Sequence, residues 1–484
     1  MQPVCEGHPQ VVGRSAGLHL VLRPPDVVNE PVLQGESDVD AAGASIYGSV
    51  IRDGGRFRMW YQAWPRDWDG TDVLSVACVE SDDGRTWRRP AYGLVECCGS
   101  RANHLTDLPF HSPSVLVDPT AAAERRFRAF GYCTPRRLGP RFPHQVERPG
   151  YFTAHSADGL HWELDSPQPL LPDADVITSA WDPWSGCARL LLKRNGLAAG
   201  LHRRRFFSAT WADGQLSEPV SALIPDESDD AGARVRGFHS ADYYGAALMP
   251  TPGPTLAVLW NFRHYLPLGH DDVHLLDYGS AGCVDLSVVC QPERGGRWLH
   301  LPGRPDWLCA AQAPAWARGA LYTAASPLDV GDETWLYFTG TVDQHGRYGV
   351  DKQWPQWCAD SASQGGFSRI GLLTWPRLRL VGYCASLTER LQLVARPAAG
   401  PGQLAVNVVC GPGGHLRARL LDGHRQPLPG YDFGDCLPLD GSALEARVRW
   451  HGKWQLPAPL PHEPLVAEVE LCNATLYAFD FTCG

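Results

Sequence analysis

One turn sequence occurs twice in this chain, as Ser81-Asp-Asp-Gly-Arg-Thr-Trp87 and as Ser156-Ala-Asp-Gly-Leu-His-Trp162. Each copy follows a short run of β-forming residues. Asp-Gly favours a hairpin with a two-residue turn, because both residues tolerate positive φ. Weaker copies follow at 209–214 and 287–298. A hairpin that recurs along a chain predicts a radially repeated sheet structure, with each Trp packed between neighbouring repeats.

The composition agrees with many short strands. The 484 residues include 50 Gly, 41 Pro and 18 Trp but only 3 Met. This balance suits strands joined by tight turns and leaves little room for long helices. Charged residues make up 20% and hydrophobic residues 44% of the chain, which is ordinary for a globular protein.

Five strand-turn-strand units follow one another between residues 44 and 380, and their first strands begin near residues 45, 114, 176, 243 and 320. Beyond 380, apolar and polar residues alternate between Gly/Pro turns up to the end of the chain. We therefore predict an all-β fold: a five-bladed β-propeller over 44–380, followed by a β-sandwich over 381–484. Residues 1–43 are expected to form an irregular lead-in segment.

Charge and motifs exclude several classes of function. The net charge of −10 and the pI of about 6.0 give no reason to expect nucleic acid or an anionic membrane as a partner. The sequence contains no run of about 18 apolar residues, so no membrane span is predicted. The N-terminus lacks a signal-peptide pattern, and the 15 cysteines are mostly scattered singly. We expect reduced thiols, a cytoplasmic protein and no cofactor, and the oligomeric state stays open.

Several phrases resemble a known group of enzymes. They are Phe57-Arg-Met-Trp-Tyr61, Ser114-Val-Leu-Val-Asp-Pro119, Ala180-Trp-Asp-Pro183 and Tyr337-Phe-Thr-Gly340. Together with the five units, they resemble the clan of glycoside hydrolases that includes families 32 and 43, and more closely a bacterial branch of family 32-like proteins. The resemblance implies an active site in the funnel at the propeller axis. It also implies three carboxylates from the inner strands of the first three blades, and it allows a structural Ca²⁺.

Such carboxylates deliver a proton to the leaving oxygen and face the anomeric carbon of the sugar. This chain departs from the family, since it has Tyr47 and His111 where the first two blades would carry acidic residues. The acidic candidates that remain are Asp175 and Asp242, at the starts of the third and fourth inner strands, and Asp40 or Glu36 from the loop before the first. Each also has an ordinary reading as a turn or strand-edge residue.

Six further residues are candidates for contacts with a sugar, as hydroxyl ligands or stacking rings. They are Tyr47, His111, Arg194, His239, Tyr322 and His345. Trp60 and Trp181 are further aromatic candidates near the axis, although most of the Trp residues must belong to the core.

These observations predict a glycoside hydrolase or transglycosylase acting on a furanoside, fructosyl or arabinosyl, in the propeller funnel. Two alternatives stay open. The missing family motifs fit a carbohydrate-binding propeller without catalysis, and propellers also serve as scaffolds that bind proteins at a rim.

Overall fold

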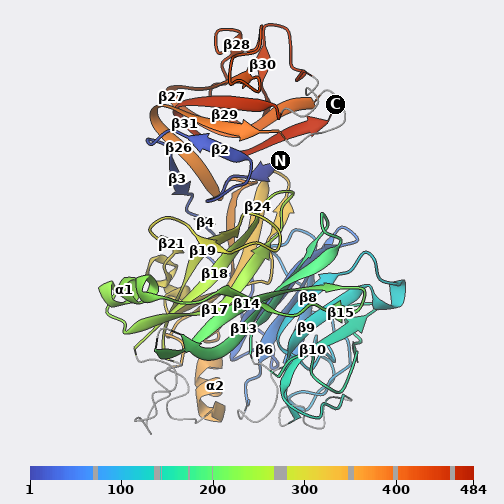
Figure 1. Cartoon of the computed structure of the whole chain (residues 1–484). Helices are drawn as coiled ribbons and strands as arrows, with labels where there is room; N and C mark the ends of the chain where they lie inside the picture. The colour runs from blue at the N-terminus through green and yellow to red at the C-terminus, as the bar shows by residue number, and fades with distance from the viewer. Residues whose placement is uncertain are drawn as a thin grey trace.

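The computed structural model describes residues 1–68, 75–135, 142, 144–172, 175–198, 200–265, 281–346, 354–395, 402–457 and 464–483. The described chain is nearly all β, as predicted (Figure 1). Its two α-helices are α1 (Glu227–Val235) and α2 (Trp354–Ser363), and short 3₁₀ turns lie at Ala123–Arg125, Ala310–Gln312 and Ala315–Ala317. None of the described helices is long and apolar enough to cross a membrane.

Five antiparallel sheets follow one another in chain order, and we number them first to fifth. The first contains β5 (Gly43–Asp53), β6 (Arg56–Trp64) and β7 (Ser75–Ser81). The second contains β8 (His111–Val117), β9 (Phe127–Cys133), β10 (Gly150–Ser156) and β11 (Glu163–Leu164). The third contains β12 (Ile177–Asp182), β13 (Cys187–Ala198), β14 (Leu201–Ala212), β15 (Gln215–Leu216) and β16 (Val220–Leu223).

The last two sheets are joined by one parallel pair between Val284 and Ala320. The fourth contains β17 (Ser240–Met249), β18 (Thr255–His264), β19 (Gly282–Gln291), β20 (Leu299–His300) and β21 (Asp306–Leu308). The fifth contains β22 (Ala320–Thr323), β23 (Leu328–Val330), β24 (Glu333–Thr341), β25 (Ser368–Pro376) and the N-terminal β4 (Asp26–Val27). The strands expected from the five sequence units are therefore confirmed.

The first strands of the five sheets form a ring. β5, β8, β12 and β17 each contact the next, β17 contacts β22, and β22 contacts β5. Serine hydroxyls tie the ring together in its middle. The amide of Val115 donates to Ser49 Oγ at 2.8 Å, and the amide of Ser179 donates to Ser114 Oγ at 2.8 Å. We call the five strands of this ring, β5, β8, β12, β17 and β22, the inner strands.

The two repeated turns have the same geometry and link neighbouring sheets. In both, the Ser side chain accepts from the Gly amide at 2.8 Å (Ser81 and Gly84; Ser156 and Gly159). The carbonyl of Gly84 accepts from Tyr337 Oη in the fifth sheet at 2.7 Å, and that of Gly159 accepts from Trp60 Nε1 in the first sheet at 2.7 Å. Each turn thus fastens its sheet to the preceding one in the ring.

The expectation of a two-residue hairpin is wrong for these two copies. The strand that returns after the second copy is β11, which pairs His155 with Glu163 across a longer loop. The side chain of Asp158 instead closes that loop by accepting from the amides of Leu160 and His161, as Asx turns do. The two-residue hairpin occurs at a weaker copy, where β14 and β15 are joined by Asp213 and Gly214 alone, both with positive φ.

The N-terminal segment is not irregular, which corrects the sequence-based expectation. Its strands β1 (Gln2–Pro3), β2 (Val11–Arg14) and β3 (His19–Leu22) pair with β26 (Val381–Val394) or β31 (Val466–Cys483). β27 (Gly402–Leu421) and β29 (Ser442–Arg447) complete that sheet, and β28 (Cys436–Leu437) pairs with β30 (Arg449–Trp450). Figure 1 shows this C-terminal sheet stacked on one end of the five-sheet body, with the N-terminus at the junction. Short strands without clear alternation gave no periodicity from which this pairing could be predicted.

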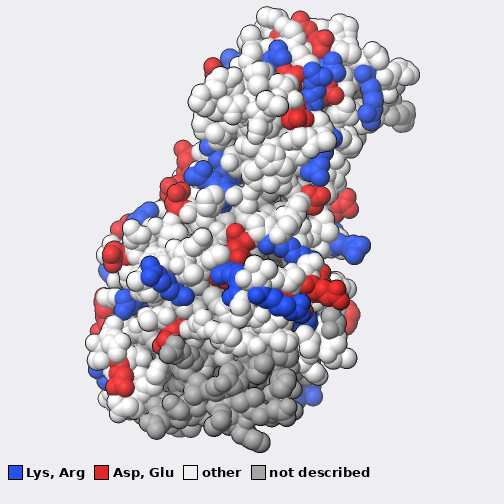
Figure 2. Space-filling model, turned by 90° about the vertical axis from the view of Figure 1, so that its left-hand side faces the viewer, with Lys and Arg blue, Asp and Glu red and all other residues white. Residues whose placement is uncertain are grey.

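Charges of both signs are mixed over the surface that Figure 2 shows. None of the cysteines whose side chains the structure describes is in a disulfide.

Candidate functional site

Three of the five inner strands, β5, β8 and β17, carry bulges near their first residues. The pairing of β5 with β6 shifts between Ser45 and Ser49, around Tyr47. β8 shifts against β9 after His111, and β17 shifts against β18 around Tyr244. Bulges place two or more residues opposite one, which re-aims side chains and is common beside functional sites.

Asp175 lies two residues before the third inner strand, β12, and its carboxylate contacts one imidazole and one ammonium group. His111 Nε2 lies 2.9 Å from its Oδ1, and Lys193 Nζ, from β13, lies 2.6 Å from its Oδ2. The Asp175 side chain remains 26% exposed, whereas that of Lys193 is only 3% exposed. The charge of Lys193 and the bond from His111 outweigh desolvation, so the pKa of Asp175 lies well below its usual range.

The backbone of Asp175 is unusual as well. Its φ is 146°, a region that L-residues rarely adopt. Backbone strain of this kind persists where surrounding contacts fix it, and it is concentrated at functional sites. The amide of Asp175 donates to Tyr151 Oη at 3.1 Å, which helps to hold this conformation.

Aromatic rings connect His111 to the other side of the axis. Tyr47 lies 5.7 Å from His111 and 5.0 Å from Tyr322, between ring centroids. Tyr322 lies 6.1 Å from Tyr244, and the ammonium of Lys193 lies 4.6 Å from the centre of the Tyr244 ring. A closed circuit results, with at least one residue from each of the five sheets. We call it the axial ring: Tyr47, His111, Asp175, Lys193, Tyr244 and Tyr322.

His345, which follows β24, joins the axial ring from outside. Its Nε2 lies 3.2 Å from Tyr244 Oη, and its imidazole lies 5.1 Å from the Tyr244 ring. The structure thus brings together five residues that the sequence singled out: Tyr47, His111, Asp175, Tyr322 and His345.

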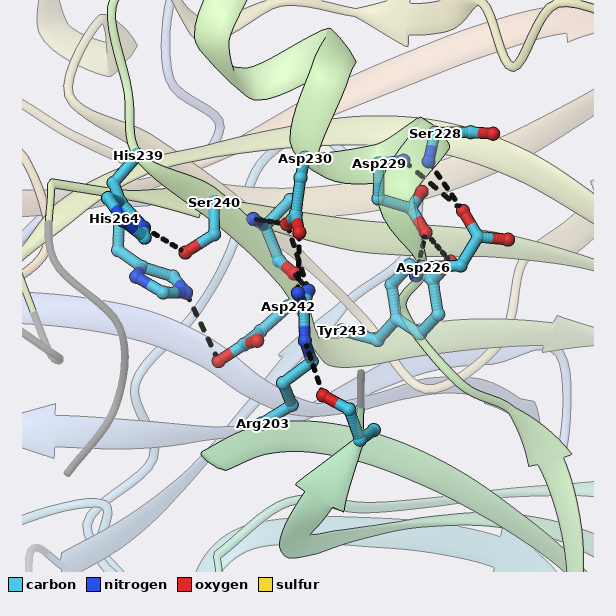
Figure 3. A network of polar contacts seen from close by, with 12 residues as sticks. Arg203, Asp226, Ser228, Asp229, Asp230, His239, Ser240, Asp242, Tyr243 and His264 are labelled. Atoms are coloured by element: carbon cyan, nitrogen blue, oxygen red, sulfur yellow. Dashed lines mark hydrogen bonds and ion pairs between the residues drawn. The ribbon is translucent and has the colours of Figure 1, made fainter. Parts of the chain in front are cut away.

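Asp242 is connected to the axial ring through one intervening residue, Arg204. Its side chain is fully buried, with Arg204 Nη1 3.0 Å and His264 Nε2 3.3 Å from Oδ2. The guanidinium of Arg204 lies 5.5 Å from the Tyr244 ring and so connects Asp242 to the axial ring. Figure 3 shows His264 directed at Asp242. The bond from His264 and the charge of Arg204 lower the pKa of Asp242 despite its burial, so it is an ionised, internal carboxylate.

His239 and Arg194 lie beside this group without contributing to it in the described contacts. His239 is exposed and hydrogen-bonds Ser240 Oγ at 2.9 Å (Figure 3). Arg194 points its guanidinium at Phe207, 4.8 Å from the ring centre, on the opposite face of β13 from Lys193. Strand alternation explains this, because adjacent residues point to opposite faces.

Asp40 and Glu36 belong to a different cluster. Arg89 binds both, with Nη1 2.8 Å from Glu36 and Nε 3.2 Å from Asp40. Asp40 also accepts from Tyr61 Oη at 2.7 Å and is fully buried. None of the described contacts of these two acids involves a residue of the axial ring. Trp60, which was expected near the axis, is fully buried between the first and second sheets.

Sequence reasoning missed Lys193, Arg204, Tyr244 and His264, which stand on second and third strands or inside a bulge. Lys193 carried a signal, since it is a lone Lys inside an apolar strand and must have a buried partner. No three His, Cys, Asp or Glu side chains of the described regions converge as a metal site.

Known proteins offer little guidance. No family model matches the chain, and no curated protein is similar to it. Among solved structures, it is similar to an exo-β-1,3-galactanase from Phanerochaete chrysosporium, with 10% identity, 94% of this chain and 100% of that chain covered, and a TM-score of 0.39. It is also similar to a Bombyx mori GH32 β-fructofuranosidase, with 11% identity, 94% of this chain and 95% of that chain covered, and a TM-score of 0.40. For an N-acetylgalactosamine deacetylase from F. plautii, the identity is 13%, the coverage is 75% of this chain and 96% of that chain, and the TM-score is 0.43. We take no activity from these similarities.

Proposed function

We propose that the protein is a glycoside hydrolase or transglycosylase that acts on glycosides at the axial ring. The observation that carries the proposal is the position of Asp175, an ionised and partly exposed carboxylate held between His111 and Lys193. An ionised carboxylate stabilises the positive charge that develops at the anomeric carbon in glycosyl transfer. Tyr47 and Tyr322 offer apolar ring surfaces with polar tips, which suit a sugar.

His111 is the group best placed to exchange a proton with the leaving oxygen. Its Nε2 is engaged with Asp175, while its Nδ1 is buried without a hydrogen-bond partner among the described residues. A carboxylate that orients an imidazole in this way sets its tautomer and leaves the other nitrogen for proton transfer. Asp242 acts through Arg204 as a positioning residue, because it has no described contact with the axial ring itself.

The narrower parts of the proposal come from the sequence. The resemblance to families 32 and 43 favours a furanoside, fructosyl or arabinosyl, as the substrate. The ring of inner strands supports reading the five sheets as a five-bladed propeller over 44–380. The bulged, bent strands of the C-terminal sheet support a β-sandwich over 381–484, with β1–β3 added to it.

A panel of fructosides and arabinosides, together with pyranosides of the same leaving groups, tests the activity. We expect release of reducing sugar from at least one furanoside. If no glycoside is cleaved but a sugar raises the melting temperature of the parent and not of Tyr47→Ala, the site is a binding site without catalysis. If the protein neither cleaves nor binds any of these sugars, a carbohydrate function is refuted.

A further inference from the structure

A cavity lies at the end of the inner strands opposite the axial ring. Asp175, His111 and Tyr47 stand near the starts of their strands, whereas the ends of the same strands line a cavity of about 640 Å³. The lining includes Arg52, Val117 and Trp181 from the first three sheets. β8 has seven residues, His111–Val117, so its ends lie six residue steps or roughly 20 Å apart at about 3.3 Å per residue.

The middle of the axis separates the two ends. There the bonds of Ser49 and Ser114 tie neighbouring inner strands together, and a gap of only about 10 Å³ remains, with Ser114, Thr178 and Ala246 in its lining. A space of this size holds at most one water molecule. A ligand in the far cavity therefore does not reach Asp175.

The far cavity has both an aromatic wall and hydroxyl-binding groups. Trp184 lines it with half of its side chain exposed, which is unusual for so large an apolar residue. The guanidinium of Arg294 lies 6.0 Å from the centre of the Trp184 ring and donates a hydrogen bond to Asp182. Ser326 and Asp329 line the cavity as well, and Asp329 uses Oδ1 to accept from Thr334.

Two guanidinium groups of the lining lack an anionic partner. Arg52 contacts the Phe57 ring at 5.7 Å, and only the backbone of Arg377 is hydrogen-bonded, to Asp332 and Asn407. In the described regions, neither side chain makes a hydrogen bond or an ion pair, although most Arg side chains around the five sheets do. Leu378 follows Arg377 with a φ of 63°, a strained conformation for a bulky residue, and strain of this kind is concentrated at functional sites.

We propose that this far cavity binds an anionic sugar, a sugar phosphate or a uronate. The oxyanion is bound by Arg52 and Arg377, whose planar forks match carboxylate and phosphate oxygens. The sugar ring stacks on Trp184, and its hydroxyls bond Ser326 and Asp329. The volume lies within the range typical of small-ligand pockets. The site is independent of the proposed activity at the axial ring.

Isothermal titration of the full chain with glucose 6-phosphate and glucuronate tests this proposal, with glucose as the neutral match and inorganic phosphate as the anion alone. We expect at least one anionic sugar to bind while glucose does not. Arg52→Gln and Arg377→Gln should each weaken binding about tenfold, the loss of a charge-assisted hydrogen bond. Trp184→Ala should weaken binding as well.

Arg148→Gln is the matched control, since Arg148 is exposed and does not line the cavity. Binding should be unchanged in this variant and in Asp175→Asn, which separates the far cavity from the axial ring. The proposal is overturned if neither anionic sugar binds, if glucose binds equally well, if phosphate binds as tightly as the sugars, or if the two Arg substitutions leave the affinity unchanged.

Discussion

Lys193 places its ammonium 2.6 Å from Asp175 Oδ2 and 4.6 Å from the centre of the Tyr244 ring. One buried cation thus fixes the carboxylate of the third sheet against an aromatic ring of the fourth. Because the pair keeps Asp175 ionised, the carboxylate can serve as a base, a nucleophile or a charge stabiliser, but not as an acid at neutral pH.

Removing this cation should change the pH dependence of activity. In Lys193→Met the pKa of Asp175 rises, since it loses its main cationic partner. Activity that needs the carboxylate is lost as pH falls through that pKa, so the acid limb of the pH–rate profile should move to higher pH. Lys453→Met, the same substitution at an exposed Lys near Tyr431, should leave the limb in place.

Leaving-group dependence distinguishes the roles of His111 and Asp175. If His111 protonates the leaving oxygen, His111→Asn should reduce cleavage of alkyl glycosides by about 10²–10⁴-fold and affect 4-nitrophenyl glycosides much less. Asp175→Asn should impair both. Steady-state rates on the two substrate types measure this, and equal losses for both substrates in His111→Asn would contradict the assignment of the proton donor.

Asp242 should matter for stability. Asp242→Asn leaves the charge of Arg204 without its buried partner, at a cost of about 3–5 kcal/mol in the free energy of unfolding. Glu36→Gln is the control, because the Glu36 side chain is 60% exposed and its pair with Arg89 contributes about 1 kcal/mol or less. Urea denaturation followed by circular dichroism measures both. A loss in Asp242→Asn no larger than in Glu36→Gln would contradict the buried pair.

The geometry of the second repeated turn predicts that an alanine substitution destabilises the protein more at Gly159 than at Gly99. Gly159 has a φ of 76°, and a Cβ there would lie 2.7 Å from the Trp60 ring; Gly99 has a φ of 73° with open space around it. Gly99→Ala should cost about 1 kcal/mol for backbone strain alone. Gly159→Ala should cost at least about 2 kcal/mol more, through overpacking against Trp60. Equal melting temperatures for the two variants would show that the second turn does not fasten the first two sheets.

Asp40 predicts sensitivity to acid. His104, whose Nε2 lies 3.7 Å from Asp40 Oδ2, and the charge of Arg89 lower the pKa of Asp40 in spite of burial. The stabilisation is therefore complete above the unfolded-state pKa of about 4 and is lost as pH falls through the lowered folded-state value. Unfolding between pH 5 and pH 2 should show a smaller pH dependence in Asp40→Asn than in the parent. The same dependence in both proteins would argue against this linkage.

Much of the fold could be predicted from the sequence because β-forming runs separated by turn residues mark most of the long strands. The Asp-Gly pair in both copies of the repeated turn also indicated a shared local geometry, although the turn type was predicted wrongly. The pairing of β1–β3 with the C-terminal sheet could not be predicted, since strands of two to four residues carry no periodicity.

The site was predicted in part, because strand starts identify which residues approach the axis. Tyr47, His111, Asp175 and Tyr322 were found this way. Tyr244 and Lys193 were missed for different reasons. The bulge that turns Tyr244 inward has no sequence signature, and Lys193 stands on a second strand, whose contact with the axis depends on the tertiary arrangement. Asp40 and Asp242 illustrate the reverse: acidic residues near strand starts whose charges serve buried ion pairs.

The most direct test of the central claim is kcat/KM for the best furanoside, compared between the parent and Asp175→Asn. Asp118→Asn is the control, since Asp118 caps an outer turn by accepting from Thr120. We predict a loss of at least about 10³-fold in Asp175→Asn, as expected for a removed transition-state charge, with parental activity in Asp118→Asn. The melting temperature should fall only in Asp175→Asn, because the buried Lys193 loses its anionic partner, so activity is compared well below that temperature. Parental kcat/KM in a folded Asp175→Asn variant would contradict the assignment of the axial ring as a glycosidase site.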